Sequence, residues 1–174
     1  MDEEKEPRRK IVHSMKYPVT PAIRFLKKQG IPFERHLYAY RERGGTKVSA
    51  RQLNVPESSV VKTLIFKDQT GKPLIVLMTG DKQVSTKALA RRLGVKQVVP
   101  CDPGEAEKHS GYKVGGTSPF GVRKNMPVYL EKCVLDLNTL YINGGKRGFL
   151  VSLTPNDLIK LLNPTVVEVG ISHA

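Results

Sequence analysis

Two glycine-rich segments stand out among the residues that could do chemistry. Residues 111–121 read GYKVGGTSPFG, and residues 144–148 read GGKRG. Glycine permits a positive φ angle and lets a ligand come close to the backbone, while Pro119 restricts the loop that contains it. Main-chain N–H groups presented by such loops suit an anion or a developing oxyanion. The alternative interpretation is two ordinary surface turns in a basic protein.

Lys62 is the titratable residue with the most unusual neighbours. It lies in VVKTLIF, residues 60–66, where apolar side chains on both sides would keep water from its ammonium group. Loss of water lowers a lysine pKa, and a compact ammonium in such a place can hold one bound anion. The alternative is a lysine on an edge strand whose stem lies on the sheet while its charge reaches solvent.

Two familiar catalytic signatures are incomplete. Residues 116–120, GTSPF, depart from the G-x-S-x-G nucleophile elbow because Phe120 replaces its second glycine. A phosphate-binding P-loop at Lys146 would need serine or threonine where Arg147 stands. A serine nucleophile and ATP hydrolysis are therefore not favoured.

Histidine and cysteine give no recognisable site either. His36 and His109 are the histidines expected inside the fold, and neither has an obvious catalytic partner in the sequence. Cys101 and Cys133 lie in no C-x-x-C or Cys/His metal spacing, so we expect free thiols in a reducing compartment. The sequence predicts neither a metal nor another cofactor.

The charge balance indicates a polyanionic partner. The 174 residues include 29 Lys and Arg against 16 Asp and Glu, a formal net charge of +13. Nucleic acid is the commonest partner of such a chain. The cations are spread along the sequence without interleaved aromatic residues, which favours a broad surface for phosphates over the reading of single bases.

The domain organisation is expected to be simple. Residues 1–17 are charged and aperiodic and predict a flexible tail, and residues 18–174 predict one domain. No apolar run approaches the roughly 20 residues of a membrane span, so we expect a cytoplasmic protein without a membrane partner.

Capping and periodicity signals predict the elements that would position these residues. Helices are expected over residues 21–29, 50–53, 86–93, 103–110 and 155–162, and each begins after a capping residue. These residues are Thr20, Ser49, Ser85, Asp102 and Thr154. Strands are expected over residues 33–40, 60–66, 74–78, 95–99, 128–130, 139–142, 149–153 and 165–169. Short turns between strands and the absence of G-x-G-x-x-G favour an α+β domain. Its sheet should be mixed, mostly antiparallel and curved like a barrel, with flanking helices.

Taken together, these segments resemble the YbaK and prolyl-tRNA synthetase editing-domain family, the trans-acting aminoacyl-tRNA deacylases. The resemblance runs from about Thr20 to Val169 and is carried by VKTL at residues 61–64, by GYKVGGTSPFG and by GGKRG. It implies a mixed sheet curled into a barrel and removal of a wrong amino acid from tRNA without a metal, a serine nucleophile or a histidine base. The implied partners are tRNA(Pro) mischarged with cysteine or alanine, and prolyl-tRNA synthetase.

The resemblance also implies roles for individual residues. Lys62 matches the family's essential lysine, which holds the phosphate of the 3′-terminal nucleotide. Gly115 and Pro119 match a GxxxP motif whose backbone positions the amino acid and the attacking water or the carbonyl oxygen. The substrate-binding positions are the pocket-lining Tyr38 and Thr63, the loop residues Gly116 and Ser118, and the glycine-rich wall of Gly144, Gly145, Lys146 and Arg147.

Two positions depart from the YbaK branch of the family. Gly44-Gly45-Thr46 stands where that branch typically has an aromatic residue, and Leu150 stands where an acid often follows GGKRG. YbaK-type members act on Cys-tRNA(Pro), whose own thiol attacks the ester and leaves as a thiolactone, whereas relatives clear Ala-tRNA(Pro) with water. The whole-chain similarity favours the cysteine branch.

Non-catalytic functions are the alternative. A tRNA- or DNA-binding protein of the same fold, or a sensor of a free amino acid, would also carry the fold and the charge. The presence of Lys62 together with Gly115 and Pro119 favours the enzyme.

Overall fold

The computed structural model describes residues 16–173. The expected tail over residues 1–17 therefore lies outside the described residues, except for Lys16 and Tyr17. Tyr17 packs against the domain, since its ring centroid lies 6.4 Å from that of Phe149 and the Arg35 guanidinium lies 4.4 Å from its ring centroid.

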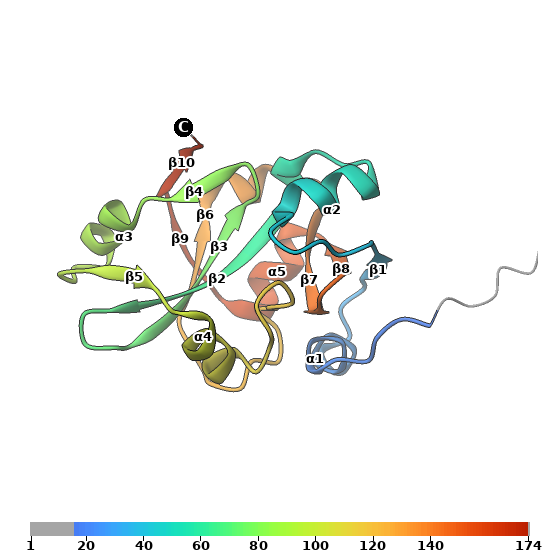
Figure 1. Ribbon diagram of the computed structural model, residues 1–174, viewed down its shortest axis with the longest axis horizontal. Coiled ribbons are helices and arrows are strands. Elements are labelled where there is room, and N and C mark those ends of the chain that lie inside the picture. The colour runs from blue at the N-terminus through green and yellow to red at the C-terminus, as the bar shows by residue number, and fades with distance from the viewer. Residues whose placement is uncertain (1–15, 174) are drawn as a thin grey trace, which may run out of the picture.

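One mixed sheet of eight strands forms the centre of the molecule (Figure 1). Its strands run in the order β1-β8-β7-β2-β3-β6-β9, with β5 beside β2, and β4 and β10 form a separate two-stranded sheet. The strands are β1 (Glu34–Leu37), β2 (Val60–Asp68), β3 (Pro73–Thr79), β4 (Lys82–Val84), β5 (Val98–Pro100), β6 (Val128–Glu131), β7 (Leu140–Lys146), β8 (Phe149–Leu153), β9 (Thr165–Val167) and β10 (Gly170–Ser172).

The sheet is mostly antiparallel, as predicted. Antiparallel pairing joins β1 to β8, β8 to β7, β2 to β3 and β2 to β5. Parallel pairing joins β2 to β7, β3 to β6 and β6 to β9. The sheet is curled but is not a closed barrel, because β1 and β9 are its two unjoined ends and lie at opposite sides of Figure 1.

Helices flank the sheet, and most begin where the sequence predicts. They are α1 (Pro21–Gln29), α2 (Gly45–Leu53), α3 (Thr86–Leu93), α4 (Pro103–Ser110) and α5 (Pro155–Leu162), with 3-10 turns at η1 (Glu57–Ser59) and η2 (Lys132–Asp136). The predicted N-caps Thr20, Ser85, Asp102 and Thr154 each accept a hydrogen bond from the amide three residues ahead. No helix within residues 16–173 is long and apolar enough to cross a membrane.

The predicted N-cap at Ser49 is wrong. Helix α2 begins at Gly45, and Ser49 lies buried in its interior with its hydroxyl donating to the Thr46 carbonyl at 3.1 Å. The first turn has no side-chain cap. It is held instead by the Thr46 hydroxyl, which donates to Glu57 at 2.8 Å, a contact between segments that local signals do not reveal.

The strand predictions differ from the structure mainly at short strands and strand ends. Strand β1 is shorter than predicted, β5 starts at Val98, and β4 and β10 were not predicted. The GGKRG segment lies between the predicted strands 139–142 and 149–153, which made it a turn, but β7 continues through Lys146. Its pairing with β8 shifts register between Asn143 and Lys146, so the two glycines form a bulge inside the strand.

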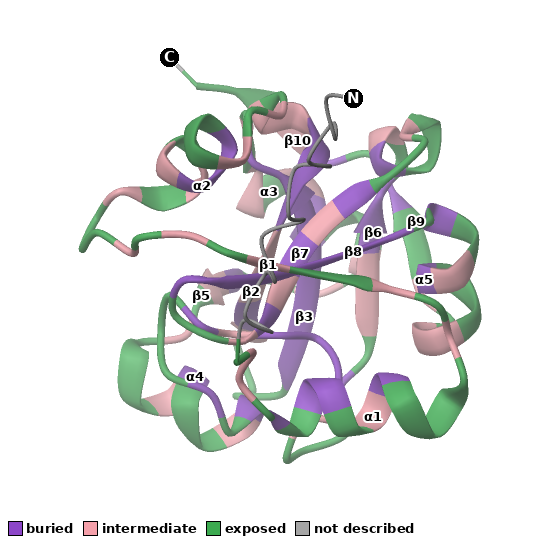
Figure 2. Cartoon of the chain, turned by 90° about the vertical axis from the view of Figure 1, so that its right-hand side faces the viewer, coloured by how far each residue is buried: buried purple, intermediate pink, exposed green. Residues whose placement is uncertain are grey.

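The two faces of the sheet pack against different helices. On β2, Val61 and Ile65 face the main core, which also buries Leu26 of α1 and Leu158 of α5. The alternate residues Val60, Leu64 and Phe66 face the other side, where Val60 packs with α2 and Phe66 belongs to a cluster that includes Leu89 of α3. Figure 2 shows this burial along the central strands and the inner faces of the helices. The alternation along β2 determines where Lys62 and Thr63 can point.

Thr20 and Thr154 provide a matched test of how α1 is attached to the sheet. Both are threonine N-caps followed by proline, but the buried Thr20 hydroxyl also donates to the Gly144 carbonyl. We expect Thr154→Val to lower the free energy of unfolding by about 1 kcal/mol and Thr20→Val by about 2–3 kcal/mol, because the latter also leaves a buried carbonyl unpaired. Urea denaturation measures both, and equal losses would show that the bond to Gly144 contributes nothing.

Candidate functional site

The glycine loop, residues 111–121, is anchored in the core by two aromatic side chains. Tyr112 is 5% exposed and donates its hydroxyl to the Phe120 carbonyl, while Phe120 is fully buried. Burial raises the pKa of Tyr112 to about 12, so this hydroxyl remains a donor. Ser118 is also buried, with its hydroxyl accepting from the Phe120 amide at 3.2 Å. Pro119 is buried beside it, so the second half of the loop is fixed in the core.

Asn143 connects the glycine loop to the bulge of β7, which comprises residues 143–146. Its side-chain oxygen accepts from the amides of Gly145 at 2.7 Å and Lys146 at 3.1 Å. Its side-chain nitrogen donates to the Gly115 carbonyl at 3.1 Å. Sequence reasoning missed Asn143, although an asparagine directly before two glycines is typical of a side chain that bonds its own following backbone.

The glycine loop and the end of β7 are in backbone contact. A Cβ atom on Gly116 would lie 2.8 Å from the Arg147 amide nitrogen and 2.9 Å from the Lys146 carbonyl carbon, so only glycine fits without a shift. The exposed Arg147 side chain turns back over the loop and donates to the Val114 carbonyl at 2.8 Å. The two glycine segments singled out in the sequence therefore meet in the folded chain.

A third segment, the chain following β1, completes this cluster. A Cβ on Gly115 would lie 2.7 Å from the Tyr40 hydroxyl, and the Arg147 guanidinium lies 5.2 Å from the Tyr40 ring centroid. Tyr38 donates its amide to the Gly148 carbonyl at 2.9 Å. The Tyr38 ring packs beside α2, and burial raises the pKa of its hydroxyl.

Strand β2 has an open stretch of edge next to this cluster. One edge of β2 pairs with β3 along most of its length. The other edge pairs with β7 at Val60 and Val61 and with β5 only from Phe66 to Asp68. Residues 62–65 lie where β7 and β5 separate, and the Ile65 carbonyl there accepts from the Cys101 amide at 3.0 Å. Backbone polar groups on such an open edge are available to other partners.

Lys62 lies at the start of this open edge. It follows the Val61–Ile142 pair of two parallel strands, so it is level with Asn143 on the same face of the sheet. Burial lowers the pKa of Lys62, as its apolar neighbours predict, while the carboxylates of Glu57 and Asp81 oppose that shift.

The Lys62 ammonium has its hydrogen-bond partner outside the two glycine segments in this structure. It donates to the Lys82 carbonyl at the start of β4, and no hydrogen bond among residues 16–173 joins it to either glycine segment. A neutral carbonyl is its partner, so an anionic ligand could replace that contact with a charge-assisted one.

Thr63 faces the opposite side of the sheet from Lys62, because side chains alternate along a strand. Its hydroxyl oxygen is buried and has no hydrogen-bond partner among the described residues. A buried hydroxyl without a partner is costly, and this one lies on the core-facing side of β2.

Two surface hollows lie elsewhere, on either side of Arg91 in α3. Their volumes are about 590 and 430 Å³. Arg92 and Lys132 line the first, and Lys87 and Lys96 line the second. The predicted site residues line neither hollow. The second hollow has no acidic residue in its lining and therefore fits phosphate groups, whereas in the first the Glu168 carboxylate lies 3.0 Å from the Lys132 ammonium.

The curled mixed sheet and the contact between the two glycine segments are those expected of an aminoacyl-tRNA editing domain, and the comparison with known families agrees with this class. The model of the aminoacyl-tRNA editing domain matches residues 44–161, and the chain belongs to this family.

Two relatives are similar to the whole or to part of this chain. The chain is 27% identical over 151 residues to "Putative Cys-tRNA(Pro)/Cys-tRNA(Cys) deacylase EbsC" of Enterococcus faecalis, covering 86% of this chain and 92% of that protein. It is 29% identical over 97 residues to the proline–tRNA ligase of Streptococcus suis, covering 56% of this chain but only 16% of the ligase.

A solved structure confirms the fold. "Crystal structure of a putative trans-editing enzyme for prolyl tRNA synthetase" superposes with a TM-score of 0.76 at 22% identity, covering 90% of this chain and all (100%) of that one. Together with the strand order, this likeness establishes the single-domain YbaK-like architecture that the sequence predicted.

Gly116 tests the contact between the glycine segments. We expect Gly116→Ala to lower the free energy of unfolding by about 1–3 kcal/mol, because the added methyl group meets backbone atoms that must shift. Gly104→Ala in α4 is the matched control, since its Cβ would meet only Asp102 at 3.6 Å. It should leave stability unchanged or raise it by up to about 1 kcal/mol. Thermal melts with equal stability for the two variants would contradict the close contact.

Proposed function

We propose that this protein removes the amino acid from mischarged tRNA(Pro), with Cys-tRNA(Pro) as its main substrate. The observation that carries the proposal is the link through Asn143, which places the glycine loop and the β7 bulge beside the strand that bears Lys62. The family membership and the printed name of the Enterococcus relative support this substrate class. We place the editing domain at residues 18–174 and its action in the cytoplasm, where tRNA is charged.

Lys62 would hold the phosphate of the 3′-terminal nucleotide. Its ammonium already lies in a half-buried place with a neutral carbonyl as partner. Exchange of that carbonyl for a phosphate oxygen would create a charge-assisted hydrogen bond where water screens little. The exposed Lys146 and Arg147 on the neighbouring wall would add positive charge beside the nucleotide.

The glycine loop would position the ester. Within the described part of the chain, the amides of Gly115 and Thr117 donate to no acceptor, whereas the Gly116 amide is taken by the Lys113 carbonyl at 2.8 Å. The amides of Lys113, Val114 and Ser118 are likewise without an acceptor there, and we assign Gly115 and Thr117, which flank the bonded Gly116, to the ester carbonyl and to the oxyanion that develops from it. The buried Pro119 and Ser118 keep this backbone fixed before the substrate arrives.

The nucleophile would come from the substrate or from water. In Cys-tRNA(Pro) the cysteine sulfur forms a bond to its own ester carbonyl carbon, the bond to the ribose oxygen breaks, and the thiol proton passes to that oxygen. Alanine has no thiol, so Ala-tRNA(Pro) would need a water at the same carbonyl. The Ser118 hydroxyl is buried and hydrogen-bonded, so it is not placed as an enzymic nucleophile.

The rest of the tRNA would lie on the cationic surface. Helix α3 presents Lys87, Arg91 and Arg92 to solvent and carries no acidic residue. Phosphates of the tRNA would supply most of the affinity there. Prolyl-tRNA synthetase would be the source of the mischarged tRNA, as the relatives named for it suggest.

Substitution of Lys62 tests whether this residue acts in an editing site or is only a strand lysine without a role. Lys62→Ala should reduce single-turnover deacylation by roughly tenfold to a hundredfold, because it removes a charge-assisted contact of about 1.5–3 kcal/mol. Lys62→Arg should restore activity only in part, since a planar guanidinium does not replace a compact ammonium in a tight site. Lys72→Ala, which removes an exposed lysine in the turn after β2, is the control and should keep the wild-type rate. A wild-type rate in folded Lys62→Ala would end the assignment.

The choice of substrate is tested by comparing three esters. We expect loss of Cys-tRNA(Pro) to be fastest and Pro-tRNA(Pro) to be spared, because only cysteine carries the attacking thiol. Thiolactone among the products would identify the thiol route. Faster loss of Ala-tRNA(Pro) would assign the protein to the water-dependent branch. Binding of tRNA without loss of any ester would show a non-catalytic protein.

A further inference from the structure

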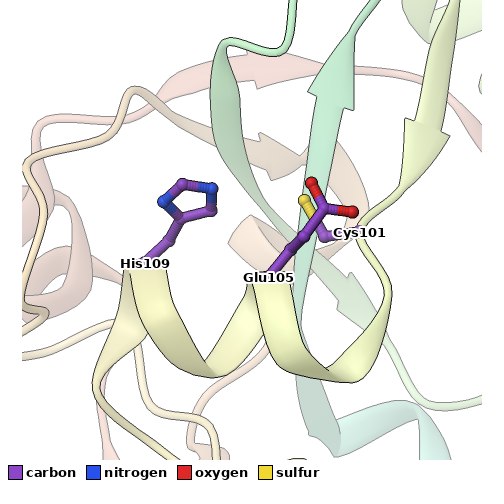
Figure 3. A group of neighbouring side chains, drawn as sticks. All are labelled: Cys101, Glu105 and His109. Carbon is purple, nitrogen blue, oxygen red and sulfur yellow. The ribbon is translucent and has the colours of Figure 1, made fainter.

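A group of metal-ligating side chains lies outside the proposed editing site. Cys101 follows β5, and Glu105 and His109 lie four residues apart on one face of α4. The sulfur, a carboxylate oxygen and an imidazole nitrogen all lie within 4.8 Å of one another. Figure 3 shows the sulfur beside the Glu105 carboxylate and the His109 ring one helical turn further along.

We propose that Cys101, Glu105 and His109 bind one divalent metal ion, with Zn²⁺ as the ion that fits best. Thiolate, imidazole and carboxylate are the three ligand types that zinc takes in proteins, and the thiolate disfavours Mg²⁺ and Ca²⁺. Three protein ligands leave the fourth tetrahedral position for water. The proposal departs from the expectation of no metal, because the spacing Cys-x₃-Glu-x₃-His is not a familiar motif and the group becomes visible only in the folded chain.

The geometry needs only a small closure. Zinc–ligand bonds of about 2.0–2.3 Å place tetrahedral ligand atoms roughly 3.5 Å apart, so side chains within 4.8 Å must approach by about an ångström. All three residues are half-buried and retain contact with solvent, which leaves room for side-chain rotation and a path for the ion.

Lys67 competes with the metal for Glu105. Its ammonium lies 2.7 and 2.8 Å from the two Glu105 oxygens. Both partners are about one-third exposed, at 30% and 33%, so this ion pair is weak. The cost of breaking it when the metal binds should weaken the Zn²⁺ affinity by no more than about fivefold.

The Cys101 thiol must also lose its proton. Burial raises its pKa, the neighbouring Glu105 and Asp102 carboxylates act in the same direction, and Lys67 opposes them. Metal binding therefore releases a proton and is tighter at higher pH.

The position of the site suggests a structural role. Gly111, the C-cap residue of helix α4, is also the first residue of the glycine loop. A metal held by Cys101 and His109 would tie the end of β5 to the last turn of α4. It would stiffen the stem of the loop without taking part in the reaction at the ester.

Metal binding is tested on the full chain after treatment with a chelator. Calorimetric titration with Zn²⁺ should give one equivalent bound, and Co²⁺ should produce a thiolate-to-metal charge-transfer band. Zinc at about 100 times its Kd should raise Tm by roughly 5–10 °C. Cys101→Ser and His109→Gln should each weaken Zn²⁺ binding by more than about tenfold, because loss of even an outer-shell partner costs about tenfold to a hundredfold. Cys133→Ser, which alters the other cysteine of the chain, is the control and should bind as the wild type does.

Two results would overturn the proposal. One is wild-type Zn²⁺ affinity no higher than that of Cys101→Ser, and the other is a charge-transfer band that disappears in Cys133→Ser instead. Glu105→Gln tests the third ligand separately and should weaken Zn²⁺ binding by more than about tenfold. A wild-type affinity in this variant would exclude Glu105 as a ligand.

Discussion

The three hydrogen bonds of the Asn143 side chain hold the candidate site together. Two of them fold the β7 bulge around the side-chain oxygen, and the third holds the Gly115 carbonyl. Glycine at position 116 lets the two backbones touch, and the Arg147 side chain adds a hydrogen bond to the Val114 carbonyl of the loop. The position of the loop therefore depends on a neutral side chain that would not itself react with a substrate.

Rigidity of this kind suits a reaction that needs little chemical help. An aminoacyl ester is already activated, so positioning and stabilisation of the oxyanion can supply most of the rate enhancement. The loop is fixed by buried aromatic side chains, whereas the Lys62 ammonium rests on a replaceable carbonyl partner. We infer that the backbone part of the site is prepared in advance and that Lys62 changes partner when the nucleotide arrives.

Local sequence signals predicted much of the fold. Thr20, Ser85, Asp102 and Thr154 satisfy the first amides of their helices with their own side chains, so the sequence alone locates these helix starts. Three-residue strands such as β4 and β10 carry too little pattern to be seen, since pairing with each other defines them. The start of α2 likewise depends on the hydrogen bond from Thr46 to Glu57, which lies 11 residues further along the chain.

The candidate site was predictable in its parts but not in its arrangement. Composition identified both glycine segments and Lys62, because their local chemistry is unusual. Asn143, the open edge of β2 and the group around Cys101 arise from contacts between distant segments, which no single-sequence pattern encodes. Alternation along β2 also places Thr63 and Lys62 on opposite faces, so the two residues cannot line one surface with their side chains.

A crystal structure with an amide-linked, non-hydrolysable analogue of 3′-cysteinyl-adenosine carrying its 5′-phosphate would test the central claim most directly. The account predicts the phosphate within about 2.7–3.2 Å of the Lys62 ammonium and the carbonyl oxygen within the same reach of the Gly115 or Thr117 amide. The Lys62 ammonium should then have left the Lys82 carbonyl. An analogue bound in the hollows beside α3, with Lys62 still on that carbonyl, would contradict the account.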